Sequence, residues 1–155
     1  MNQAAIAGRI PHQGRMCLLE RVVAWGPERI ECSASSHRAG DNPLRAHGRL
    51  GIACGIEYAA QAMAVHGALV AETDGASQGA PRVGYLASVR GVAFHATRLD
   101  DIHGDLSVSA ERVMGDASNI VYSFAVEADG RMLLSGRATV VLDAGHALRL
   151  GSRPA

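Results

Sequence analysis

The stretch from Asn42 to Glu72, NPLRAHGRLGIACGIEYAAQAMAVHGALVAE, joins a glycine-containing loop to a long apolar segment. The segment from Ile52 to Ala71 is rich in Ala, Leu, Met and Gln, which are good helix formers, and it predicts a helix of roughly 30 Å. Glu57 is its one formally charged residue. Because the segment is apolar on nearly every side, we expect this helix to be buried on nearly every side.

Glu57 is the residue of this helix that most needs an explanation. An ionised carboxylate is costly to bury without a hydrogen-bonding partner, and Gln61, one turn later on the same face, is a natural partner. Two interpretations remain open. Glu57 either begins the helix, favours its dipole and stays partly solvated, or it is a functional acid in a cleft.

The segments on either side of the helix are typical of β-strands. Before it, Leu18 to Trp25 and Arg29 to Ser36 predict two strands that are separated by the turn signal Gly26-Pro27. After it, alternating apolar residues predict four strands in an antiparallel meander, at about 82–93, 106–110, 120–126 and 132–142. One curved antiparallel sheet around one long central helix is an α+β architecture, the hot-dog arrangement. Its unpaired edge strand predicts a homodimer.

Length, charge and cysteine content limit the class of protein. The chain of 155 residues predicts a single domain, 1–155, with a core of about 8–143 and a loose C-terminal tail. Its 15 basic and 15 acidic residues form no run, which argues against nucleic-acid and membrane-surface binding. The 3 cysteines lack a CxxC spacing, and no HExxH motif occurs, so we expect neither a disulfide framework nor a metal site. Without a recognisable signal peptide, we expect a cytoplasmic protein.

Three groups of residues resemble the 3-hydroxyacyl-acyl-carrier-protein dehydratases of fatty-acid synthesis. Ile10-Pro11-His12, followed by residues 18–22, LLERV, resembles the opening motif of these enzymes, and Asn42-Pro43 followed by His47 resembles their loop motif. The helical motif is matched by residues 57–61, EYAAQ. Residues 55–64, GIEYAAQAMA, are more similar still to the hot-dog dehydratases of bacterial aryl-polyene gene clusters. The loop departs from the family pattern, because Gly48-Arg49 follows His47.

The resemblance implies a dehydratase that converts a 3-hydroxyacyl thioester on acyl carrier protein into the trans-2-enoyl thioester, in fatty-acid-like or aryl-polyene biosynthesis. It implies that His47 is the base for the α-proton and Glu57 the acid or water-orienting group, from opposite subunits. We expect the amides around Cys54, Gly55 and Ile56 to hold the thioester oxygen.

The substrate would be carried by phosphopantetheine, on acyl carrier protein or coenzyme A, and no other cofactor is expected. Gln61 is a further candidate for the substrate site. Arg45 and Arg49, beside the loop, are either ligands for the phosphate or the acidic carrier protein, or ordinary surface charges. His37 and His12 are rival candidates for the functional histidine, and His12 is alternatively a structural residue.

Two other functions stay open. A hot-dog thioesterase would use Glu57 to activate water or to attack the carbonyl directly, and it would not need His47. A catalytically weak partner subunit would bind acyl carrier protein or stabilise an active hot-dog subunit in a heterodimer. His66 lies on roughly the opposite face of the helix from Glu57, and we expect it to pack.

Overall fold

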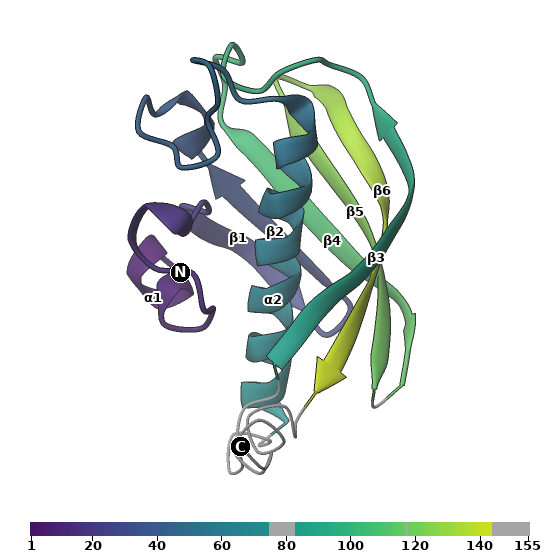
Figure 1. Cartoon of the computed structure of the whole chain (residues 1–155). Helices are drawn as coiled ribbons and strands as arrows, with labels where there is room; N and C mark the ends of the chain where they lie inside the picture. The colour runs from purple at the N-terminus through teal and green to yellow at the C-terminus, as the bar shows by residue number, and fades with distance from the viewer. Residues whose placement is uncertain (75–82, 117, 144–155) are drawn as a thin grey trace, which may run out of the picture.

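A six-stranded antiparallel sheet curves around one long helix in the computed structural model, which describes residues 1–74, 83–116 and 118–143 (Figure 1). The strands are β1 Arg21–Gly26, β2 Arg29–Ala34, β3 Val83–Phe94, β4 Leu106–Gly115, β5 Asn119–Ala128 and β6 Arg131–Asp143. The helices are α1 Gln3–Ala7 and α2 Gly55–Thr73, with 3-10 turns at Gly14–Met16, Ser36–Arg38 and Ile52–Cys54. The predicted hot-dog architecture is confirmed; the predicted loose tail lies outside the described residues.

The order of strands in the sheet is β1-β2-β4-β5-β6-β3. The prediction that the last four strands form a simple meander is therefore wrong for β3, which pairs with β6 instead of β4. β4, β5 and β6 do form a meander, and Asp129 and Gly130 turn β5 into β6 with positive φ angles of 53° and 73°, as a primed hairpin turn requires. Alternation along a strand marks its buried face but not its neighbours, so the sequence pattern did not reveal this crossover.

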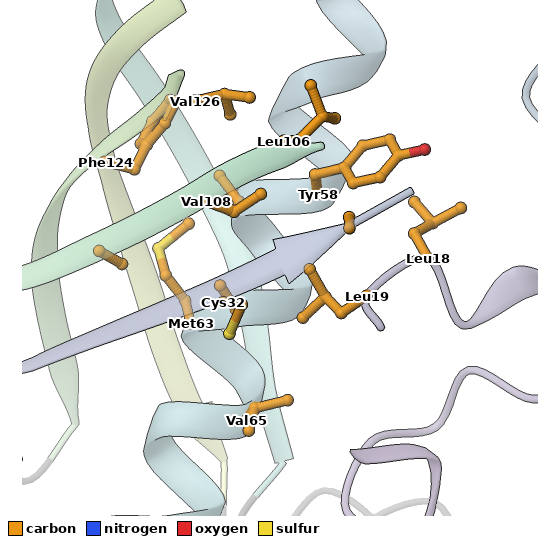
Figure 2. Close-up of a cluster of buried hydrophobic side chains, with 14 of the residues drawn as sticks. Leu18, Leu19, Cys32, Tyr58, Met63, Val65, Leu106, Val108, Phe124 and Val126 are labelled. Carbon is orange, nitrogen blue, oxygen red and sulfur yellow. The ribbon is translucent and has the colours of Figure 1, made fainter. Parts of the chain in front are cut away.

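The concave face of the sheet buries one side of α2. Figure 2 shows side chains of β2, β4 and β5 gathered around Tyr58, Met63 and Val65 of the helix, all of which are buried. The opposite side of α2 is covered less completely. Small residues that lie on the same helical face as Glu57 are only half-buried: Ala60, Ala64, Gly67, Ala68 and Ala71.

His66 connects α2 to two parts of the sheet. Its Nδ1 lies 2.8 Å from the Tyr122 hydroxyl, and its Nε2 lies 2.8 Å from the carbonyl oxygen of Gly26. The Tyr122 and His66 rings meet edge to face, with their centroids 5.6 Å apart. Burial lowers the pKa of His66. The prediction that this histidine packs in the core is confirmed, and its two polar contacts explain how a buried imidazole is tolerated.

The N-terminal segment lies on the other side of α2 from β5 and β6 (Figure 1). Ile6 and Ile10 are buried, and Arg9 forms an ion pair with Glu72 near the end of α2, with 2.8 Å between Nε and Oε2. At the β1 edge, the Val22 amide donates a hydrogen bond to the carbonyl oxygen of Met1. In the described part of the chain, no helix is long and apolar enough to cross a membrane.

Candidate functional site

Glu57 lies in the first turn of α2, where the helix dipole favours a negative charge. Its side chain is 41% exposed, and its Oε1 lies 3.5 Å from Nε2 of His12, whose side chain is 27% exposed. The carboxyl group is therefore partly solvated, as one of the two interpretations of the sequence predicted. It also has an imidazole neighbour, which the helical pattern alone did not indicate.

His12 is carried by the connection between α1 and the first 3-10 turn. The side-chain amide of Gln13 holds this connection by donating to the carbonyl oxygen of Ala7 at 2.9 Å, and Gly14 turns the chain with a φ of +57°. The Nδ1 atom of His12 is buried and has no hydrogen-bond partner among the described residues. The ring thus presents Nε2 to Glu57 and keeps Nδ1 inside the protein.

Gln61 does not pair with Glu57, contrary to the sequence-based expectation. Its Nε2 donates to the carbonyl oxygen of Met16 at 2.7 Å, and its Oε1 accepts the amide of Leu18 at 2.9 Å. Gln61 is fully buried, and these two bonds fasten the segment that follows His12 to α2. Both polar atoms of its side chain are therefore bonded to the backbone of the same chain.

The start of α2 also differs from expectation. A 3-10 turn precedes the helix, so the Cys54 amide donates to the Gly51 carbonyl at 3.0 Å and the Gly55 amide to the carbonyls of Ile52 and Ala53. These two amides are therefore not free to hold a thioester oxygen, and of the three expected donors only Ile56 stays a prediction.

Close packing explains the choice of glycine at position 55. An added Cβ would collide with the buried side chain of Leu134 on β6, so Gly55 is required by the core of the chain itself. Beside it, burial raises the pKa of the Cys54 thiol, which opposes formation of a nucleophilic thiolate.

His47 is at the tip of an exposed turn. His47 and Gly48 have φ angles of 54° and 75°, and the residues on either side, Ala46 and Arg49, form an isolated β-bridge. Within the described chain, no hydrogen bond or ion pair connects His47 to Glu57. Arg45 stiffens the loop by donating to the carbonyl oxygens of Ala39 and Gly48, whereas Arg49 is exposed.

His37 is buried and faces away from solvent. Its Nε2 lies 3.1 Å from the carbonyl oxygen of Ile102 and 3.0 Å from that of Gly104, so this nitrogen donates. Burial lowers the pKa of His37, and the positive charge of Arg38 acts in the same direction. His37 therefore holds the loop 102–104 and is not available to a substrate.

A buried polar network that the sequence did not reveal anchors the loop before α2. Asn42 donates through Nδ2 to the Ser36 carbonyl at 2.9 Å and to the Tyr58 hydroxyl at 3.1 Å. Its Oδ1 accepts the amide of Leu44 at 2.8 Å. Burial raises the pKa of Tyr58, so its hydroxyl keeps its proton. The Asn-Pro pair is the only sequence signal of this anchor, because the partners come from distant segments.

The described residues leave the carboxyl group of Glu57 partly open to solvent, with its side chain 41% exposed. A shallow hollow of about 390 Å³ lies elsewhere and is lined by Gln3, Gly14, Arg15, Cys17, Ser36, Ala39, Asp41 and Asn42. Among the described residues, no group of three or more His, Cys, Asp or Glu side chains is placed to hold a metal ion. A carboxyl and an imidazole at a partly open helix start can transfer protons, but exclusion of water requires a further surface.

Comparisons with known proteins point to one family. The model of the ApeP-like family, described as ApeP dehydratase, matches residues 4–148. Among solved structures, the chain is similar to the dehydratase heterocomplex ApeI:P from Xenorhabdus doucetiae, with 20% identity over 96% of this chain and 97% of that chain and a TM-score of 0.79.

Thioesterases share the fold as well. A thioesterase family protein from Silicibacter pomeroyi is 19% identical over 90% of this chain and 93% of that chain, with a TM-score of 0.62. A mutant thioesterase from Pseudomonas aeruginosa is 15% identical over 79% of each chain, with a TM-score of 0.57. At these identities the structural likeness shows the fold alone. No curated protein sequence matches the chain.

Proposed function

Because the chain belongs to the ApeP-like family of hot-dog dehydratases, we propose that it takes part in dehydrating a 3-hydroxyacyl thioester on acyl carrier protein to the trans-2-enoyl thioester. The observation that carries the proposal is the position of Glu57. Its carboxyl group lies in the first turn of α2 and is open on one side, inside the helical motif that resembles the family. The acyl chain grows toward a fatty-acid-like or aryl-polyene product.

The reaction needs two proton transfers. A base takes the proton from the α-carbon, and the electron pair that is released forms the new carbon–carbon double bond. The bond between the β-carbon and its hydroxyl oxygen breaks while Glu57 gives this oxygen a proton, so that water leaves. We assign the base to His47 of the opposite subunit. The exposed position of His47, apart from Glu57 of its own chain, is consistent with such a division of roles.

A second hot-dog subunit completes the site in this proposal. The two edges of the sheet differ, since Met1 occupies part of the β1 edge whereas β3 carries exposed Leu86 and Phe94. The half-buried small residues of α2 provide a surface on which a second helix can pack closely. The structural neighbour from Xenorhabdus doucetiae is a heterocomplex, so the partner is either a second copy of this chain or a different hot-dog subunit.

A coupled assay tests the reaction. The purified chain, alone and after co-expression with a second hot-dog dehydratase subunit, is mixed with 3-hydroxyacyl thioesters of short to medium chain length. Enoyl absorbance and free thiol are followed together, on acyl carrier protein and on coenzyme A. We expect enoyl formation without thiol release, and at least a hundredfold loss in the Glu57→Gln variant, as is usual for general acids.

The other outcomes separate the alternatives. Release of thiol that depends on Glu57 would assign the chain to the thioesterases and contradict the proposal. If Glu57→Gln does not change the rate of enoyl formation, the chain is a stabilising partner, and the catalytic residues belong to the other subunit. Activity of the chain alone, in a fraction whose molar mass is that of a dimer, would identify the partner as a second copy.

A further inference from the structure

We propose that His12 is the positioning residue of Glu57, acting within the same chain. This inference rests on the proposed function, because it concerns how the acid of that reaction is held. The contact between His12 Nε2 and Glu57 Oε1, at 3.5 Å, is longer than a well-formed hydrogen bond. Catalytic contacts are often long in ligand-free structures and shorten in the substrate complex.

The chemistry of the contact assigns different tasks to the two carboxyl oxygens. Oε1 can accept a hydrogen bond both in the carboxylate and as the carbonyl oxygen of the protonated acid. A proton on Nε2 of His12 therefore holds Oε1 before and after proton transfer. Oε2 is then the oxygen that carries the acidic proton and faces the substrate hydroxyl.

The fold fixes this pair through α2 itself. Glu57 is on the first turn of the helix, and Gln61, one turn later, binds the segment just after His12 through Met16 and Leu18. On the other side of His12, Arg9 is joined to Glu72 of the same helix. The ring is thus held between two anchor points that belong to the element carrying the acid.

The two buried histidines, His37 and His66, do not offer this arrangement. The nitrogens of His37 and His66 that make polar contacts face backbone carbonyls or Tyr122, and both rings are buried. His12 is partly exposed at the contact while its Nδ1 is enclosed. Its orientation therefore leaves Nε2 as the atom that contacts Glu57. Side chains that place a donor where only one of the two ring nitrogens lies can test this role.

Three substitutions at position 12 form the test, measured in the assembled enzyme. In His12→Gln the side-chain amide nitrogen reaches the place of Nε2, and we expect kcat within about threefold of the wild type. In His12→Asn the amide reaches only the place of Nδ1, and in His12→Ala it is absent. For both we expect kcat to fall about 10- to 100-fold, the range for lost supporting contacts, with KM changed less than about threefold.

Added imidazole and a matched control complete the activity test. Because the His12 site is partly exposed, imidazole can enter the space left in His12→Ala, and we expect it to restore part of kcat. His103, which is exposed, provides the control, and His103→Ala should keep wild-type rates. Equal kcat in His12→Ala and wild type, with Glu57→Gln inactive, would overturn the role of His12 and leave the proposed function standing.

A spectroscopic measurement makes the inference testable even if no dehydration is found. Long-range proton–nitrogen spectra at alkaline pH, where an imidazole is neutral, report which ring nitrogen carries the proton. We expect His12 to hold it on Nε2 in the wild type, and the chemical shifts of Nε2 and its proton to change in Glu57→Ala, where the hydrogen-bond acceptor is lost. Identical His12 signals in the two proteins would contradict the inference independently of activity.

Discussion

His37 and His66 are buried imidazoles that stabilise the fold only while they are neutral. Burial lowers the pKa of both from the ordinary value of 6.5. In the unfolded chain the ordinary value returns, so below pH 6.5 the unfolded state binds more protons than the folded state. The contribution of these two histidines to the free energy of unfolding is therefore fully present above pH 6.5. It is lost as the pH falls from 6.5 toward their lowered pKa values.

Urea unfolding at about pH 7.5, 6.5 and 5.5 measures this effect. We expect the free energy of unfolding to fall across this range, and the fall to be shallower in His66→Gln, which has one buried titrating group fewer. His95→Gln, at an exposed position, should keep the wild-type slope. A slope that is unchanged in both His66→Gln and His37→Gln would show that other groups cause the pH dependence.

The sequence correctly places several residues of the helical motif at the start of α2, but it does not predict which residues their side chains contact. Helical spacing predicts Gln61 as the partner of Glu57, but the side-chain amide of Gln61 is bonded to the carbonyl of Met16 and the amide of Leu18. His12 reaches Glu57 from a segment that is separated by the whole first hairpin. Contacts between distant segments depend on how the elements dock, and periodicity along one element carries no information about them.

At the scale of the element, α2 contains a glycine that the single chain does not need. An added Cβ at Gly67 would meet no heavy atom within 4 Å in the described structure, although glycine inside a helix is unfavourable relative to alanine. In the proposed assembly, the missing side chain lets a second helix approach closely. Gly67 thus differs from Gly55, where the side chain of Leu134 occupies the space that a Cβ would need.

Alanine substitutions at these two glycines should have opposite effects. We expect Gly67→Ala to stabilise the single chain by about 0.5–1 kcal/mol and to weaken association with the second subunit. Gly55→Ala should instead destabilise the chain, by about 1–3 kcal/mol, because the core is overpacked. Thermal unfolding of the dissociated chain and a titration of subunit association measure the two quantities separately. If Gly67→Ala associates with the second subunit as tightly as the wild type does, α2 does not take part in the proposed contact between subunits.

The edge strand β3 supplies a second element-scale prediction. Leu86 is 40% exposed on this strand, and Val113 is 43% exposed at the end of β4. A lysine on an edge strand opposes pairing with another chain, so we expect Leu86→Lys to yield a monomer whose circular dichroism is unchanged. Val113→Lys is the matched control and should leave the molar mass, measured by light scattering, as in the wild type. Retained assembly in Leu86→Lys would place the partner elsewhere.

The strands themselves were predicted well from the sequence, whereas their order was not. The alternation of β5, in which Ile120, Tyr122, Phe124 and Val126 are buried, follows the predicted pattern. The crossover of β3 to the far edge beside β6 left no local signal, since it is decided by how the sheet closes around α2.

At the scale of the whole molecule, the described residues leave the acid Glu57 partly open to solvent. If a second subunit supplies the missing wall, folding and assembly are linked by mass action. We therefore expect the Tm to rise with protein concentration, or with addition of the other hot-dog subunit, and to become independent of concentration in Leu86→Lys. Calorimetry over a hundredfold range of concentration measures this. A constant Tm in the wild type would indicate a chain that is stable and complete alone.

The turn at His47 has a consequence for how this family changes over evolutionary time. The left-handed backbone at this position suits glycine and asparagine at least as well as histidine, and no described hydrogen bond requires the ring. Random substitution should therefore replace it freely wherever only the turn is needed. Relatives that keep histidine here while the neighbouring loop residues vary would show selection for the imidazole, and relatives that exchange it for asparagine would mark lineages in which the subunit has given up the base and kept the fold.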